Sequence, residues 1–183
     1  GYAFPRATWI AAPGATAPLE SVCGYSPMRS PIDVNELDDV TKILAALDTP
    51  EGKKIDADAV IIDDLTLYVD RTVRALAPMT ITKKGDSDGR ALWGLVRLAL
   101  LSVRDTARRV RKHVFMNAHE QPPRMNNGVR VRGGPALPGA GAEIVPAACD
   151  VTLRACPNPN ISLGWKVEYR CTVEDQDYVS GDR

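Results

Sequence analysis

The stretch that decides the fold is DAVIIDDLT, residues 58–66, a short β-branched hydrophobic run that ends in two adjacent carboxylates. A run of this length and composition predicts a buried strand of a parallel sheet. In open α/β sheets, ligands bind beyond the carboxyl ends of the strands. The stretch therefore predicts that Asp63 and Asp64 lie at an edge of the sheet where a ligand can bind.

The composition predicts one soluble domain. The chain has 183 residues, of which 44% are hydrophobic and 25% charged, enough for one α/β domain with a sizeable core but not for two large ones. Lys+Arg and Asp+Glu number 23 each, so any contact with a polyanion must be local. The longest apolar stretch, residues 91–103, is interrupted by Arg97 and is too short to span a bilayer. We expect a cytoplasmic protein that does not associate with a membrane.

The cysteines do not favour a metal site. The four thiols form no C-x-x-C pair and have only two histidines to join them. We expect buried thiols in a reducing cytoplasm, with a disulfide among Cys149, Cys156 and Cys171 left open.

Strand and helix signals alternate along the chain. A capping box formed by Asp33 and Glu36 is expected to begin the first helix, and Ser87 or Asp88 to cap the longest one. Strands are expected at 7–11, up to residue 63, at 113–118, at 149–154 and at 165–172. Helices are expected at 34–47, 65–76 and 89–112. This order predicts an α/β fold, with a mostly parallel central sheet, helices on both faces and a C-terminal β-hairpin.

Four segments carry a resemblance to a known family. They are VIIDDLT (60–66), HVFMNAHEQ (113–121), RGGPALPGAGAEIVPAACDVTLRA (132–155) and SGDR (180–183). Their order and spacing resemble the RecA-like P-loop ATPases of tailed bacteriophages that are associated with single-strand annealing and recombination. The resemblance runs over nearly the whole chain and implies a single RecA-like three-layer domain over residues 1–183.

The resemblance implies roles for the acidic strand end. Asp63 matches the Walker B carboxylate that holds Mg²⁺ directly or through water, and Asp64 matches a group that positions the attacking water. Asn117, His119 and Glu120 match the polar strand end that senses the γ-phosphate, and Glu120 joins the two aspartates as a catalytic candidate.

Further roles are implied for the C-terminal part of the chain. Residues 133–139 match a segment that faces nucleotide or DNA. Arg183 matches a basic residue near a neighbouring subunit's nucleotide site, which implies a homo-oligomer.

The phosphate-binding element of the family is missing from this sequence. No G-x-x-x-x-G-K-[ST] loop is present, and Lys53 and Lys54 lack an earlier glycine at the required spacing. In the family the strand at 7–11 follows the P-loop strand and helix, so the chain is expected to begin just after them. The resemblance implies Mg²⁺ and ATP as cofactors, whereas the missing loop leaves open that neither binds. We predict that the chain as given does not hydrolyse ATP.

Two groups of arginines are candidates for contact with single-stranded DNA. Arg124, Arg130 and Arg132 lie in a long Gly/Pro/Arg-rich loop expected at 121–142. A second group forms a stripe on the longest helix, for which we favour a solvated helix face. Its members are Arg90, Arg97, Arg104, Arg108 and Arg111.

Two classes of function stay open at this stage. The first is a DNA-recombination ATPase, or a fragment of one, acting in the cytoplasm of an infected bacterium. The second is a non-catalytic descendant that serves as a structural or assembly part of a phage particle, so that its location is the virion. In the second class the acidic pair is a relic, and Asp63 and Asp64 only begin the next helix as its N-terminal cap.

Overall fold

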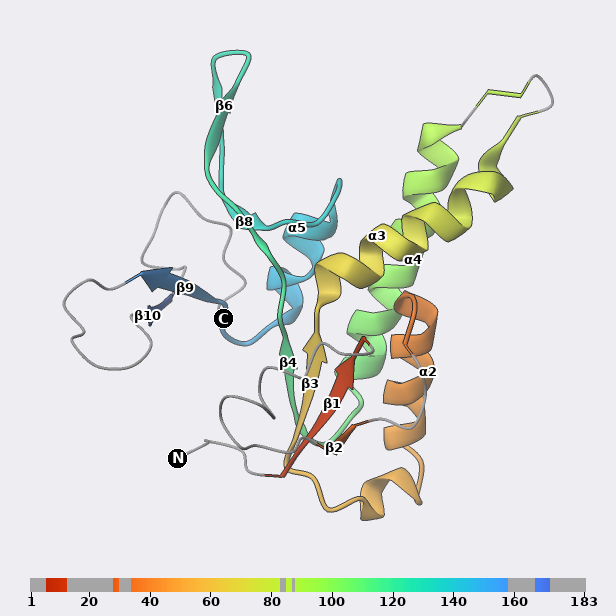
Figure 1. The fold of residues 1–183 in the computed structure, drawn as a ribbon, viewed down its shortest axis with the longest axis vertical. Helices are drawn as coiled ribbons and strands as arrows, with labels where there is room; N and C mark the ends of the chain where they lie inside the picture. Colours follow the sequence, from red (N-terminus) through yellow and green to blue (C-terminus); the bar gives the residue numbers. More distant parts are fainter. Residues whose placement is uncertain are drawn as a thin grey trace. The chain divides into compact units, whose positions relative to one another are not determined.

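The computed structural model describes residues 6–12, 28–29, 34–82, 85–86, 88–157 and 167–171. The chain forms two compact units, Gly1–His119 and Glu120–Arg183. Each unit is described by itself below, with its elements labelled in Figure 1.

The first unit is built on a parallel sheet of four strands in the order β2-β1-β3-β4. The strands are β1 (Ala7–Ala11), β2 (Met28–Arg29), β3 (Ala59–Asp63) and β4 (His113–Met116). In the shared register, Trp9 pairs with Ile61 and Ile61 with Phe115. The predicted parallel sheet is confirmed, and the strand that ends in the acidic pair lies inside it.

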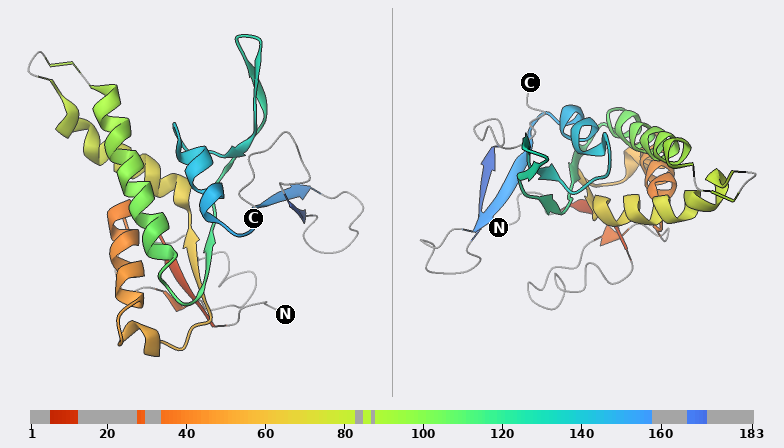
Figure 2. Two further views of the ribbon diagram at one scale, coloured as in Figure 1. Left: turned by 180° about the vertical axis from the view of Figure 1, so that it is seen from behind. Right: turned by 90° about the horizontal axis from the view of Figure 1, so that it is seen from above.

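Three helices accompany this sheet. They are α2 (Leu37–Leu47), α3 (Leu65–Leu76) and α4 (Gly89–Ala107), with the short 3₁₀ helices η1 (Gly52–Lys54) and η2 (Ala77–Thr80) between them. The crossovers from β2 to β3 and from β3 to β4 step in the same direction, so right-handed connections put all three helices on one face. The helices also contact one another, as the two views in Figure 2 show. Helices on both faces were predicted, but no described helix of this unit covers the opposite face.

The core lies between the sheet and these helices. Successive strand residues point to opposite faces, so Val60 and Ile62 are buried under the helices while Ile61 remains partly exposed on the other side. Burial of each large aliphatic side chain stabilises the fold by about 1.5–3 kcal/mol. Apolar residues recur at helical spacing on one side of α2 and of α4, and all of them are buried except Ala99 of α4, which is half-buried. The buried ones are Val34, Leu37, Val40, Ile43, Leu44 and Leu47 for α2, and Leu92, Val96, Leu100, Val103, Ala107 and Val110 for α4 and the turn after it.

The helix ends differ in part from the prediction. The N-cap of α2 is Glu36, whose backbone N–H donates to Oδ2 of Asp39 at 3.3 Å, so the capping box lies one turn later than expected. Asp33 lies outside the described residues. Asp88 caps α4 as predicted, accepting from the backbone N–H groups of Arg90 and Ala91 at 3.0 and 3.1 Å. The helix ends at residue 107, before the expected residue 112.

The second unit consists of short antiparallel pairs and short helices. Its elements are β5 (Glu120–Gln121) with β8 (Gly134–Pro135), β6 (Arg124–Asn126) with β7 (Val129–Val131), α5 (Gly141–Ile144), η3 (Pro146–Ala148), and β9 (Leu153–Pro157) with β10 (Val167–Cys171). The C-terminal hairpin is confirmed, although β9 begins later than the expected 149.

The segment 121–142 is not the irregular loop that was predicted. It contains the β6–β7 hairpin, which turns at Asn127 and Gly128 with φ values of 49° and 78°. Positive φ at both central residues is the requirement of the tight turn that joins two twisted strands, and Asn-Gly is the sequence that meets it best.

Candidate functional site

The two aspartates at the end of β3 have different roles. Asp63 is the last residue of the strand, and Asp64 is the N-cap of α3. Oδ1 of Asp64 accepts from the backbone N–H of Thr66 at 2.7 Å. This bond satisfies one of the unpaired donors at the start of the helix and sets a negative charge against the positive end of its dipole. The peptide bond between the two aspartates is cis.

Asn117 holds the carboxylate of Asp63. Its side-chain Nδ2 donates to Oδ1 of Asp63 at 3.2 Å. The backbone of Asn117 continues the ladder beyond β4, because its N–H donates to the carbonyl of Ile62 at 2.9 Å. Its own carbonyl accepts from the N–H of Leu65 at 2.8 Å. Asn117 therefore links the end of β3, the start of α3 and one oxygen of Asp63.

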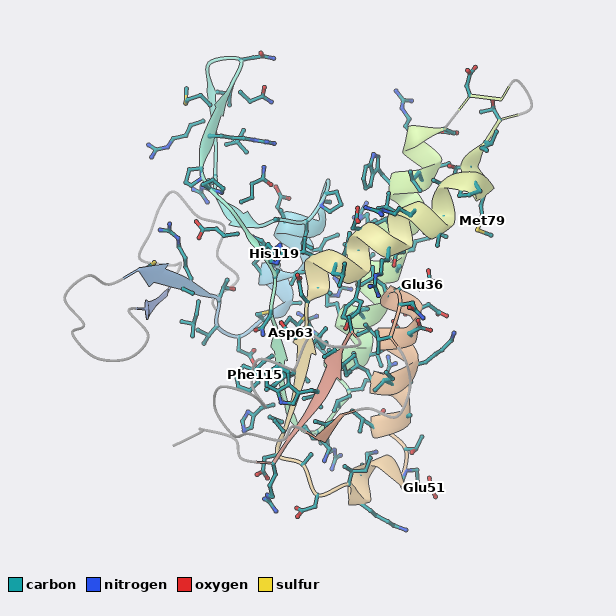
Figure 3. All side chains as sticks on the ribbon, viewed as in Figure 1. Glu36, Glu51, Asp63, Met79, Phe115 and His119 are labelled. Atoms are coloured by element: carbon teal, nitrogen blue, oxygen red, sulfur yellow. The ribbon has the colours of Figure 1, made fainter. Side chains whose placement is uncertain are left out.

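His119 lies at the same end of the sheet, as Figure 3 shows for His119 and Asp63. Its Nε2 is 3.0 Å from Oδ2 of Asp64. The backbone N–H of His119 donates to Oγ1 of Thr66 at 2.9 Å, so the main chain is held even though the imidazole is 76% exposed. Both oxygens of Asp64 thus have a partner, one on α3 and one on His119.

Tyr68 holds the backbone at the end of β3, a role that was not identified from the sequence. Its buried hydroxyl donates to the carbonyl of Asp63 at 3.0 Å and lies 3.4 Å from the carbonyl of Ile10 on β1. Burial raises the pKa of the Tyr68 hydroxyl well above its ordinary value, and the negative charge of Asp63 adds to the shift. The hydroxyl therefore stays protonated as a donor that fixes the ends of β1 and β3.

The structure brings together Asp63, Asp64, Asn117 and His119, four of the residues that the sequence singled out. Glu120 belongs to the second unit, where its Oε1 accepts from Nε and Nη2 of Arg154, each at 3.0 Å.

The other candidates lie elsewhere. Arg183 lies outside the described residues. Arg124, Arg130 and Arg132 are exposed on and beside the β6–β7 hairpin, so they lie on an ordered ribbon and not in an irregular loop.

The four grouped side chains fit a magnesium ion only in part. Within the described ranges there is no group of three or more His, Cys, Asp or Glu that could hold a metal ion. Mg²⁺ in nucleotide sites, however, takes only one or two protein carboxylates and completes its octahedron with phosphate oxygens and water. Oδ2 of Asp63 suits that role, since it makes no hydrogen bond with any described residue.

The described residues at this edge are less suited to binding a phosphate group. A helix N-terminus binds phosphate through its unpaired N–H groups and its dipole. At α3 that position is already occupied by the carboxylate of Asp64, whose charge would repel phosphate. The described residues of this edge can therefore supply a metal ligand and polar side chains, but not a phosphate cradle.

None of the described helices is both long and apolar enough to cross a membrane. No protein-family model, no curated protein and no solved structure matches this chain.

Proposed function

We propose that this chain is a RecA-like nucleotide-binding domain of a phage DNA-recombination protein, in which Asp63 would hold the Mg²⁺ of a bound nucleotide. The observation that carries the proposal is the state of the Asp63 carboxylate. It lies at the carboxyl end of an inner parallel strand, with Oδ1 fixed by Asn117 and Oδ2 directed to no described donor. Such edges are where α/β proteins bind ligands.

The residues around Asp63 hold its carboxylate in place and make its surroundings polar. Asn117 fixes one rotamer of Asp63, and Tyr68 fixes the backbone that carries it. Asp64 has both oxygens engaged, so it can orient a water molecule only when His119 moves away from its carboxylate. In this proposal, exchange of His119 between Asp64 and a bound phosphate couples the nucleotide to the start of α3.

Hydrolysis by the chain as given is not part of the proposal. The sequence has no P-loop lysine, and the N-terminus of α3 is closed to phosphate by Asp64. Loss of the groups that stabilise a transferring phosphoryl costs several powers of ten in rate. A steady-state assay with Mg-ATP is expected to show no turnover. Turnover that Asp63→Ala abolishes would contradict this expectation.

Nucleotide binding is tested by titrating the chain with a fluorescent ATP analogue, with and without Mg²⁺. We expect binding that strengthens at least tenfold with Mg²⁺, and an Asp63→Asn variant in which that gain is lost. Asp70→Asn on α3 is the control, since it removes the same charge from an exposed surface carboxylate. Equal affinity with and without Mg²⁺ in the wild-type chain would rule out the assigned role of Asp63.

A second candidate function is a non-catalytic domain that serves as a structural part of a phage particle. One observation favours it. Both carboxylate oxygens of Asp64 already have a partner within the fold, one in capping α3 and the other in the contact with His119. In this case the titration shows no nucleotide affinity, and the chain is incorporated stably into particles. Asp64→Ala then changes stability alone.

A further inference from the structure

One face of α4 combines arginines with an exposed tryptophan. Arg90, Trp93, Arg97 and Arg104, here called the α4 basic face, fall within an arc of about 60° when each helical residue advances by about 100°. The buried side of the helix, which includes Val96 and Leu100, lies next to this arc, on the side of Trp93.

The groups on this face are available to a partner. Arg90 and Arg97 are exposed, and neither guanidinium forms an ion pair or hydrogen bond with a residue in the described ranges. Arg104 is paired with the adjacent Asp105 at 2.7 Å, so it contributes less net charge than the other two. The indole of Trp93 is 44% exposed, which is unusual for the largest apolar side chain on the helix of a small domain.

We propose that the α4 basic face binds single-stranded DNA, with the arginines on the phosphates and Trp93 stacked on a base. A guanidinium pairs with phosphate through two parallel hydrogen bonds. An aromatic side chain between cationic groups is the arrangement that proteins use for unpaired bases, whose flat faces are hidden in a duplex. The proposal uses none of the residues grouped around Asp63, so it can be tested in the absence of nucleotide.

The spacing along the helix suits an extended strand. Successive arginines are seven residues apart, which corresponds to about 10 Å at 1.5 Å per residue, and Trp93 lies between the first two. The face is therefore long enough to contact several consecutive nucleotides. Contacts of this kind read the backbone and the base faces, so we expect little dependence on sequence.

The apolar side chains of α4 could instead anchor a protein. Leu98, 63% exposed, is the strongest candidate for such an anchor, and it lies about 100° around the helix from Arg97. Charge complementarity favours DNA for the basic face, since a protein anchored on Leu98 would not need Arg90 or Trp93. Leu98→Ser on the same helix therefore separates the two readings.

The experiment measures binding of the full chain to a fluorescein-labelled 20-nucleotide oligothymidylate by fluorescence anisotropy at several salt concentrations. We expect Arg90→Ala/Arg97→Ala to weaken binding at least tenfold. The slope of log affinity against log salt should fall by about 1.4 for the two lost phosphate contacts, at about 0.7 per contact. Circular dichroism confirms that each variant is folded.

Two controls change residues outside the α4 basic face. Lys54→Ala removes one exposed positive charge from η1, outside the basic face, and Leu98→Ser removes apolar surface from the same helix. Neither is expected to change the affinity more than twofold. Trp93→Ala is expected to weaken binding at least fivefold without changing the salt slope, since stacking carries no net charge.

Three results would overturn the proposal. They are wild-type affinity in the double arginine variant, an affinity for duplex of equal length that matches or exceeds that for the single strand, and no binding by the wild-type chain. A loss of binding in Arg124→Ala/Arg132→Ala with none in Arg90→Ala/Arg97→Ala would assign DNA to the β6–β7 hairpin instead. Failure of the nucleotide titration leaves this outcome unchanged, so the two proposals fail separately.

Discussion

His119 and Asp64 meet at 3.0 Å, from Nε2 to Oδ2, while the second oxygen of the same carboxylate caps α3 through the backbone N–H of Thr66. One side chain therefore joins the segment that follows β4 to the helix that follows β3. The bond from Asp64 to His119 is open to solvent, because the imidazole is 76% exposed although the carboxylate is only 21% exposed. The capping bond is the better protected of the two.

Asp64→Ala is expected to lower the free energy of unfolding by about 1 kcal/mol, the usual cost of removing an N-cap side chain. Asp64→Asn keeps an oxygen that can accept from Thr66, and asparagine is an equally good cap, so we expect it to cost only a few tenths of a kcal/mol. Urea denaturation of both variants provides the measurement. An equal loss in both would show that the contact with His119, and not the cap, carries the stability.

Tyr68→Phe removes the donor to the carbonyls of Asp63 and Ile10 without changing the shape of the core. We expect a loss of about 1 kcal/mol near neutral pH, because the two carbonyls lose the one hydroxyl that they share. Thermal unfolding of the two proteins measures the difference. A variant as stable as the wild type would show that these carbonyls find other donors.

The same hydroxyl predicts a dependence of stability on pH. Its pKa is raised above the ordinary value of 10.0, so the folded chain keeps the proton where the unfolded chain loses it. The contribution is complete below pH 10 and is lost as the pH rises toward the folded pKa. Above about pH 10 the wild type should therefore lose stability more steeply than Tyr68→Phe. The measurement is the free energy of unfolding of both proteins as a function of pH. Equal slopes above about pH 10 would contradict the assigned burial of the hydroxyl.

The sequence predicted the sheet and the buried helix faces because burial leaves a periodic pattern. Val60 and Ile62 alternate with Ile61, and the inward positions of α2 and α4 recur at helical spacing. The start of α2 was misplaced because Glu36 belongs to two pairs of acidic residues spaced three apart. It is the second member of the pair with Asp33 and the first member of the pair with Asp39. Either pair could form a capping box, so spacing alone could not choose between them.

From the sequence, residues of the candidate site could be singled out only where the residue type itself indicates a chemical role. Asp63 and Asp64 follow a buried strand, and a carboxylate at a strand end is an informative signal. Tyr68 gave no such signal, because a tyrosine on an inward helix face looks like any core residue until its hydroxyl is seen beside two carbonyls. The turn at Asn127 and Gly128 did carry a hairpin signal, which was obscured by the surrounding Gly, Pro and Arg.

Gly52 is expected to be intolerant of any side chain. A Cβ at this position would lie 2.1 Å from the carbonyl oxygen of Ala46 and 2.6 Å from Cα of Leu47, both backbone atoms of α2. We expect Gly52→Ala to cost at least about 2 kcal/mol, since α2 must shift away from η1. A Cβ at Gly94 in α4 would have no neighbouring atom within 4 Å. Gly94→Ala should therefore stabilise the chain by about 0.5–1 kcal/mol, since alanine favours the helix more than glycine does. Chemical denaturation of the pair tests the contrast, and equal effects would show that η1 is not packed against α2.

Gly128→Val should open the β6–β7 hairpin while leaving the first unit folded. Gly128 has φ of 78°, a conformation that a β-branched residue adopts only at a cost of about 1–2 kcal/mol. The hairpin is short and its strands are exposed, so this cost is comparable to the stability of the pairing itself. Limited trypsin digestion should then cleave faster at Arg124 and Arg130, with no change in the unfolding of residues 1–119. Asn127→Gly is the control, because glycine accepts positive φ and preserves the turn. Equal cleavage rates in all three proteins would mean that the hairpin does not protect these sites.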